Sequence, residues 1–258
     1  MSRIGKKFRD IVKRGEKAFI PYIMAGDPDL GRTVELVRIL EDCGADIIEL
    51  GVPFSDPLAD GPTIQKAAQR ALSGGVTLHK VIDLVADLRK HSQVPFVLMT
   101  YYNPIFKYGE ERFVRDASEA GVDGIIVPDL PPDEAGNILS FSRKADFDII
   151  FLVAPTSTEE RIRLVSKSSR GFIYYVSITG ITGSKLSMDS SISSHVSKIR
   201  SLSGKPVAIG FGISTPEEAS EVARFADGVI VGSAIVKRAS DPDASLREYL
   251  LSLRKAIS

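Results

Sequence analysis

Eight short apolar runs recur along the chain, and between them apolar residues follow helical spacing. Runs of this kind are typical of strands buried on both faces, as in parallel sheets. The stretch 30–43, with Val34, Val37 and Leu40 ahead of Gly44, is one of the intervening predicted helices. The runs predict strands at 18–25, 46–52, 95–101, 124–127, 148–153, 171–176, 206–209 and 228–231.

A strand-helix repeat of roughly 30 residues in a chain of 258 favours a closed (β/α)₈ TIM barrel. An open doubly wound sheet is the alternative, although the first strand-to-helix turn lacks the Gly-x-Gly-x-x-Gly pattern. Ile4, Phe8 and Ile11 lie at helical spacing within 2–13 and predict an extra N-terminal helix. We therefore expect one α/β domain over 1–258, a TIM barrel with one additional helix.

Composition narrows the possible partners. The 33 basic residues equal the 33 acidic ones, so no net charge favours nucleic acid or an anionic membrane. One cysteine and the lack of an apolar span of about 20 residues predict a cytoplasmic protein. Three histidines leave little material for a metal site, and we expect no metal.

One acid interrupts the apolar run 46–52. Glu49 stands between Ile48 and Leu50, where a charged, unpaired carboxylate is costly. Asp60 ends the proline-rich loop that follows, and two carboxyl groups in different surroundings are typical of acid-base catalysis. A salt-bridged core Glu49 and an Asp60 that caps the helix beginning near Pro62 are the alternatives, and these residues alone leave them open.

Glycines and hydroxyls follow the last three predicted strands, in the loops 178–185, 210–214 and 232–234. Bare backbone N–H groups beside a helix that starts at Ser233 suit a phosphate dianion, and barrels often bind phosphate at this corner. Glycine also serves tight turns, which is the alternative. The candidate phosphate-binding residues are Gly183, Gly212, Gly232 and Ser233.

Six motifs occur along the chain in a fixed order, and through them the chain resembles the tryptophan synthase alpha subunit family over essentially its whole length. They are PYIMAGDP (21–28), ELGVPFSDP (49–57), ADGP (59–62), MTYYNP (99–104), PDLP (128–131) and GFGI (210–213). The resemblance implies a lyase of tryptophan biosynthesis that needs neither metal nor cofactor. It would cleave indole-3-glycerol phosphate to indole and glyceraldehyde 3-phosphate.

The resemblance also implies roles for individual residues. Glu49 would protonate indole C3 and then take the side-chain hydroxyl proton, while an ionised Asp60 holds the indole N–H. Tyr174 would be a supporting phenol, and its neighbour Tyr175 should point away, because side chains alternate along a strand. The substrate pocket would comprise Tyr22, Thr100, Tyr102, Leu152, Thr182, Phe211 and Ile230. For Tyr101 and Phe151 we expect ordinary core packing instead.

Two proline-stiffened segments are predicted to expose apolar tips suited to a protein interface. The residues concerned are Pro53, Phe54, Asp56, Pro57, Asn103 and Pro104. By resemblance, the partner is the pyridoxal-phosphate-dependent beta subunit, in an alpha-beta-beta-alpha heterotetramer that passes indole between sites and is regulated allosterically. The loop 179–190, with Lys185, would close over the carboxylates.

Two other functions compete with this one. A Schiff-base aldolase would need a lysine at a strand end, and Lys185 is the nearest candidate. The other is a degenerate alpha-like subunit that only binds and activates a partner. The presence of both Glu49 and Asp60 disfavours it.

Overall fold

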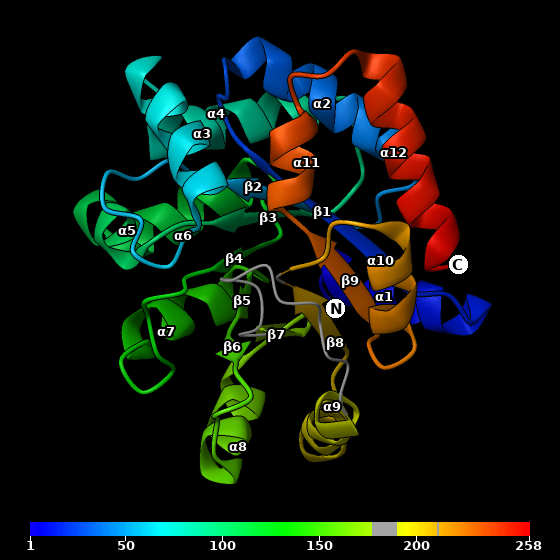
Figure 1. Cartoon of the computed structure of the whole chain (residues 1–258). Coiled ribbons are helices and arrows are strands. Elements are labelled where there is room, and N and C mark those ends of the chain that lie inside the picture. Colours follow the sequence, from blue (N-terminus) through cyan, green and yellow to red (C-terminus); the bar gives the residue numbers. More distant parts are fainter. Residues whose placement is uncertain (177–189, 211) are drawn as a thin grey trace.

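The structure is a computed structural model of the chain, which describes residues 1–176, 190–210 and 212–258. Parallel strands form its centre, and helices surround them (Figure 1). In the described residues the strands are β1 (Ala18–Met24), β2 (Ile48–Gly51), β3 (Phe96–Met99), β4 (Gly124–Ile126), β5 (Asp148–Ile150), β6 (Leu152–Val153), β7 (Ile173–Val176), β8 (Val207–Gly210) and β9 (Gly228–Val231).

Every pairing in the strand ladder is parallel, and the order is β5-β4-β3-β2-β1-β9-β8-β7-β6. Its two ends, β5 and β6, are halves of the single predicted strand 148–153, interrupted at Phe151. Arg170 N donates to Ile149 O at 2.9 Å and Tyr174 N to Phe151 O at 3.2 Å, so this stretch also joins the β7 side. The ladder therefore closes, and the predicted eight-stranded TIM barrel is confirmed.

The helices follow the strands around the barrel. Those after β1 to β4 are α2 (Leu30–Asp42), α3 (Pro62–Ser73), α4 (Leu78–Leu88), α5 (Tyr102–Tyr108), α6 (Glu110–Glu119) and α7 (Gly136–Lys144). The remaining ones are α8 (Glu159–Ser168), α9 (Ser190–Ser203), α10 (Pro216–Ala223), α11 (Ser233–Arg238) and α12 (Asp243–Ala256). Of these α5 was not predicted, since Pro104 suggested a loop. Proline is tolerated there because it lies in the first helical turn, whose N–H groups have no partner within the helix.

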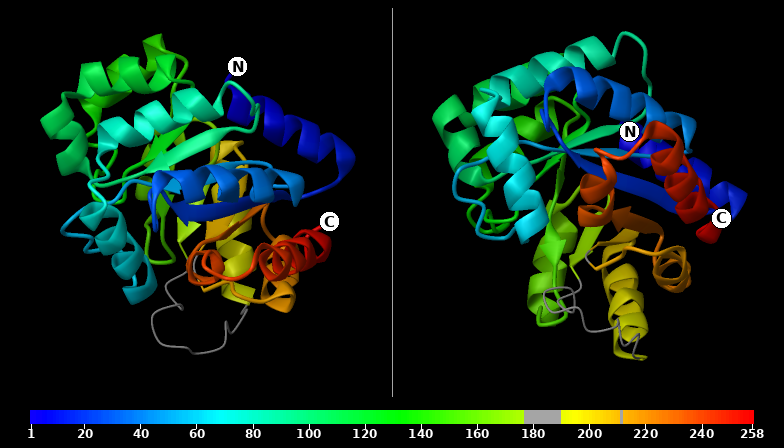
Figure 2. Two further views of the ribbon diagram at one scale, coloured as in Figure 1. Left: turned by 90° about the horizontal axis from the view of Figure 1, so that it is seen from above. Right: turned by 45° about the horizontal axis from the view of Figure 1, so that its top comes forward.

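The extra N-terminal helix, α1 (Arg3–Arg14), closes one end of the barrel (Figure 2). Its buried side chains Ile4, Phe8 and Ile11 join the apolar cluster that fills the barrel interior. The Phe8 ring lies 5.5 Å from that of Phe172, which immediately precedes β7. Because α1 fills the end at which the strands begin, only the opposite mouth is left for a site.

Candidate active site

Strand register brings the predicted site residues to one mouth of the barrel. Tyr22 on β1 pairs in register with Glu49 on β2, and Leu152 on β6 pairs with Tyr174 on β7. Tyr174, Leu152 and Ile230 belong to the interior cluster, whereas Tyr175 lies in the outer core, as predicted from strand alternation. Phe151 is likewise in the outer core.

Two glycines make room for the tyrosines. A Cβ on Gly51 would lie 2.0 Å from the Tyr22 hydroxyl oxygen, and one on Gly210 would lie 2.2 Å from that of Tyr174. Real Cβ contacts are not this short, so any side chain at either position would displace the ring. The two glycines therefore fix where both phenols lie.

Glu49 is 1% exposed, and its Oε1 has no hydrogen-bond partner in the described residues. Burial raises the pKa of its carboxyl from 4.5 to about 8, since no compensating charge is close enough to favour ionisation. None of the ion pairs in the described chain involves Glu49, so the salt-bridge alternative finds no support there. The side chain is therefore a neutral acid near pH 7 that can release a proton.

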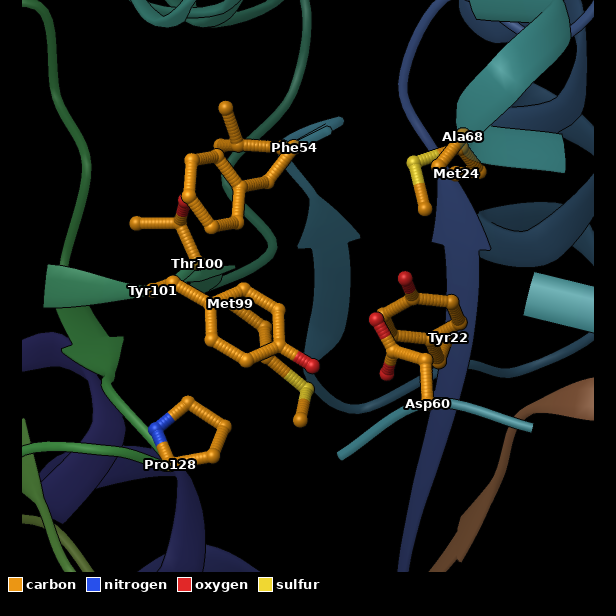
Figure 3. A pocket seen from close by; sticks show the side chains of 10 residues that line it. Tyr22, Met24, Phe54, Asp60, Ala68, Met99, Thr100, Tyr101 and Pro128 are labelled. Carbon is orange, nitrogen blue, oxygen red and sulfur yellow. The ribbon is translucent and has the colours of Figure 1, made fainter. Parts of the chain in front are cut away.

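Asp60 and Tyr101 both border the cavity (Figure 3). A hydrogen bond joins the two side chains. Burial raises the pKa of Asp60 to about 6, and the bond from Tyr101 opposes that rise. The Tyr101 hydroxyl also accepts the Ala59 N–H at 2.9 Å, which ties the loop to β3. Helix α3 is capped by Gly61 without a side-chain bond, so the alternative in which Asp60 caps this helix finds no support.

Tyr22, Asp60 and Tyr101 contribute to the wall of a small cavity (Figure 3). Its volume is about 10 Å³, which is room for about one water molecule. A nearly dry cavity of this kind favours neutral carboxyl groups and strengthens every electrostatic contact within it. The other lining residues are Met24, Val52, Phe54, Ala68, Met99, Thr100 and Pro128.

The two tyrosines after β3 lie in different places. Tyr101, expected to serve only packing, lines the cavity and holds Asp60. Tyr102, expected in the pocket, is not among the residues that line this small cavity; it begins α5, where its ring lies 5.9 Å from that of Phe106 and its hydroxyl bonds Glu110. Its backbone N–H donates to Asp129 Oδ1 at 2.8 Å. Thr100 does line the cavity, together with Met99, which sequence reasoning had not placed there.

The two predicted interface segments lie near the mouth, and the first is less exposed than expected. Pro53 is buried, and the half-buried Phe54 ring packs 5.3 Å from that of Tyr101. Leu58, next to the first segment, is 95% exposed, and Phe106, the aromatic residue of the second segment, is 66% exposed. Asp56 and Asn103 are exposed, whereas Pro57 and Pro104 are partly buried.

The predicted phosphate residues lie only partly within the described chain. Gly212 follows β8 with φ 75°, a conformation that favours glycine. Gly232 precedes α11, whose first residue Ser233 is exposed, and a Cβ on Gly232 would make an ordinary 3.7 Å contact with Tyr22. Gly183, Thr182, Phe211 and Lys185 fall outside the described residues, as does most of the predicted lid.

Two further searches of the described residues found no candidate. No group of three or more His, Cys, Asp or Glu side chains there could hold a metal ion. No helix in that part of the chain is long and apolar enough to cross a membrane.

A closed (β/α)₈ barrel with two carboxyl groups of raised pKa at its mouth defines the class of barrel enzymes that move protons with carboxyl groups. Comparison with known proteins identifies the family within that class. The model of the family "Tryptophan synthase alpha chain" matches residues 8–255. The chain therefore belongs to the tryptophan synthase alpha chain family, and the resemblance drawn from its motifs is confirmed.

Individual members of this family are similar to the chain over nearly their full length. The tryptophan synthase alpha chain of Geobacter sulfurreducens is 51% identical over 262 residues, covering 100% of this chain and 99% of that protein. Tryptophan synthase subunit alpha from Legionella pneumophila aligns with a TM-score of 0.92 at 39% identity, covering 100% of this chain and 98% of that one. A chain of aminoacrylate-bound tryptophan synthase from M. tuberculosis aligns with a TM-score of 0.91 at 37% identity, covering all of both chains.

Proposed function

We propose that this chain is the alpha subunit of tryptophan synthase and cleaves indole-3-glycerol phosphate to indole and glyceraldehyde 3-phosphate. Family membership over residues 8–255 supports the reaction. The observation that carries the proposal is Glu49, a fully buried carboxyl with a pKa of about 8 and one oxygen that has no partner in the described part of the chain. Such a group is protonated at neutral pH, yet it can be ionised by a single transfer to substrate.

Glu49 acts twice in this mechanism. Its protonated carboxyl delivers a proton to indole C3, which leaves a positive charge on the ring system. The resulting carboxylate then removes the proton from the neighbouring side-chain hydroxyl. The bond from C3 to the side chain breaks, its electron pair neutralises the ring, and the former alcohol carbon becomes the aldehyde of glyceraldehyde 3-phosphate. Glu49 ends protonated, so the cycle consumes no net proton.

Asp60 stabilises the charged intermediate. Its carboxylate accepts a hydrogen bond from the indole N–H, and its attraction for the ring grows as the ring becomes positive. Tyr101 helps to orient Asp60, because its hydroxyl bonds both the carboxyl and the Ala59 N–H. Tyr174 supports the reacting centre from β7, while Leu152 and Ile230 line the apolar part of the slot.

Phosphate binding is assigned to the loops after the last strands. Gly212 and Gly232 follow β8 and β9 at the same mouth as Glu49, and Ser233 opens α11 beside them. Backbone N–H groups there would meet the dianion, with Gly183 contributing from the loop after β7. Thr182 and Phe211 remain assigned to the substrate pocket by resemblance.

Indole is passed to a beta subunit that makes L-tryptophan, in an alpha-beta-beta-alpha assembly within the cytoplasm. Leu58 and Phe106 support an interface at the mouth, because large apolar side chains exposed at 95% and 66% favour burial against a partner. Asp56 and Asn103 would form its polar part. A solved structure of M. tuberculosis tryptophan synthase contains a chain of this fold, which agrees with such an assembly.

Indole release from indole-3-glycerol phosphate by the Glu49→Gln variant tests the proposal. The amide keeps the shape of the carboxyl but transfers no proton, so we expect kcat to fall by about 10²–10⁴-fold with KM nearly unchanged. Glu119→Gln, an exposed position on α6, is the matched control and should keep full activity. Turnover above about a tenth of wild type in Glu49→Gln would refute the role of Glu49. A wild-type chain that releases no indole with or without the beta subunit would instead favour a non-catalytic partner subunit.

A further inference from the structure

The hydroxyl of Tyr22 occupies a defined place inside the mouth. Tyr22 is 7% exposed and stands beside Glu49 in the β1–β2 register. Its hydroxyl oxygen lies over Gly51, the next interior position after Glu49 on β2, and only the missing Cβ leaves it that space. The ring borders the cavity on the same side as Asp60 (Figure 3).

No hydrogen bond in the described residues holds this hydroxyl. The contrast with Tyr101 is direct, because Tyr101 is held by Ala59 N–H and by Asp60. Burial, with the nearby charges of Asp60 and then Glu49, raises the pKa of Tyr22 well above its ordinary value of 10. The phenol therefore keeps its proton and is available as a donor beside Glu49, whose Oε1 has no partner among the described residues.

A buried polar atom without a hydrogen-bond partner, as Glu49 Oε1 is among the described residues, is costly, and a role in the reaction is one reason to keep it. A neutral Glu49 gains little from a hydrogen bond to Tyr22. When the proton moves to the substrate, Glu49 becomes a buried carboxylate, and without a hydrogen-bond donor this is the least stable form in the cycle.

We propose that Tyr22 is a positioning residue for Glu49, and that its hydroxyl donates a hydrogen bond to the Glu49 carboxylate formed during turnover. This inference rests on the proposed role of Glu49. Tyr22 thereby stabilises the ionised form of Glu49, so that this one carboxyl group can serve first as acid and then as base. It acts through Glu49 and transfers no proton itself.

Other groups face Glu49 as well. Tyr174 approaches it from β7, Asp60 from the loop after β2, and Tyr101 stands behind Asp60. These three remain in place when only the Tyr22 hydroxyl is removed. We expect a rising limb of the pH–rate profile near pH 6 from ionisation of Asp60 and a falling limb near pH 8 from ionisation of Glu49. The two limbs would then report the two carboxyl groups separately.

The test is the pH–rate profile of Tyr22→Phe, which keeps the ring and removes only the hydroxyl. Loss of a donor to the carboxylate raises the pKa of Glu49, so the falling limb should move upward by about one pH unit. The kcat at pH 7 should fall about tenfold with KM unchanged, because the bond is made only after proton transfer. Tyr175→Phe is the matched control. It removes a buried phenol hydroxyl that has no partner among the described residues, from the outer face of β7, and should leave both limbs in place.

Each other outcome has one meaning. If the falling limb of Tyr22→Phe stays where it is in wild type, the proposal is overturned, whatever the change in kcat. If only the rising limb moves, the hydroxyl acts on Asp60 and the proposal is overturned as well. A parallel urea unfolding curve for Tyr22→Phe identifies any loss that comes from folding, and the limb positions are independent of the folded fraction. An active Glu49→Gln variant would refute the proposed function itself. If Glu49→Gln is inactive and the pH–rate profile of Tyr22→Phe matches that of wild type, only the role of Tyr22 is refuted.

Discussion

The carboxyl groups at the two ends of the barrel are paired to different degrees. At the end where strands begin, Asp46, Asp123, Asp148 and Asp227 each stand within two residues of the start of a strand and each has an arginine partner. At the opposite mouth, Glu49 and Asp60 have no cationic partner among the described residues, although the buried Asp27 beyond β1 pairs with Arg70 there. Carboxyl groups that pair with arginine serve the fold, whereas the two without a cation are the candidates for the reaction.

The acids at the strand starts repeat one hydrogen-bonding pattern. Asp46 accepts the Phe19 N–H at 3.0 Å, Asp123 that of Phe96 at 2.8 Å, and Asp227 that of Val207 at 2.9 Å. In each case the donor lies at the start of a neighbouring strand. A paired carboxylate here satisfies backbone groups that the ladder leaves open, so it fixes the relative positions of adjacent strands.

Asp148 departs from this pattern and shows how hydrogen-bond and ion-pair partners affect the pKa of a buried carboxyl group. Ser2 of α1 donates to its Oδ2, while Arg170 Nε lies 3.3 Å from Oδ1 without hydrogen-bond geometry. Burial raises the pKa of Asp148 to about 6, and the Ser2 bond and the Arg170 charge oppose that rise. A less complete set of partners therefore leaves the carboxyl less favourable as an anion.

The largest expected difference between the ends is in stability. Asp123→Ala removes a carboxylate that bonds Arg89 at 3.0 Å, pairs with Arg3 and bonds Phe96 N. Breaking such a pair leaves buried donors and a cation uncompensated, so the free energy of unfolding should fall by about 3–5 kcal/mol. Urea unfolding measures it, and the kcat of the remaining folded enzyme should not change.

The control is Asp87→Ala, which removes an exposed ion pair with Lys90 and should alter stability by less than about 0.5 kcal/mol. Equal losses in both variants would mean that pairing at the strand starts contributes no more than a surface salt bridge.

The sequence predicted most of this architecture. The eight apolar runs identified the strands because parallel strands are buried on both faces, and Glu49 stood out because it interrupts one of them. The arginine partners could not be predicted in the same way. Arg254 and Asp46, for example, are 208 positions apart and meet only when the barrel closes.

The placements that differ from expectation lie just beyond strand ends, where alternation no longer applies. Tyr101 and Tyr102 are neighbours, and the start of α5 at Tyr102 turns its side chain outward while Tyr101 points at Asp60. Phe54 was expected on the surface because its loop is rich in proline, yet its ring packs on Tyr101. Both outcomes depend on contacts between segments some 40 residues apart, which local patterns do not encode.

The second-largest expected effect is on catalysis and concerns only the mouth of the barrel. Asp60→Asn keeps an acceptor for the indole N–H but removes the negative charge, so we expect kcat to fall about 10²-fold with KM nearly unchanged. Stability should be unaffected or slightly improved, because the variant removes a partly buried carboxyl with a raised pKa. Steady-state kinetics beside urea unfolding measures both quantities.

Asp83→Asn, an exposed carboxyl on α4, should match wild type in both measurements. An Asp60→Asn enzyme with unchanged kcat would remove Asp60 from the mechanism and leave Glu49 as the only carboxyl group that distinguishes the mouth.

The smallest expected effect comes from packing at the mouth. In Gly51→Ala the new Cβ would overlap the Tyr22 hydroxyl, and overpacking of this kind costs about 1–3 kcal/mol. The displaced ring should also lower kcat, since it borders the cavity. Gly136→Ala at the start of α7 has open space around the new methyl and is the control. A Gly51→Ala enzyme as stable and active as that control would show that Tyr22 does not need its observed position.

The central claim is that Glu49 is a buried acid without a cationic partner among the described residues, and its own titration tests this most directly. Carbon-13 NMR of enzyme labelled at the glutamate side-chain carboxyl, with the resonance assigned by its loss in Glu49→Gln, gives the pKa in the ligand-free protein. We predict a midpoint about pH 8. A midpoint near the ordinary 4.5 would mean that Glu49 is already an anion at neutral pH, and it would contradict both the acid role and the contrast between the two ends of the barrel.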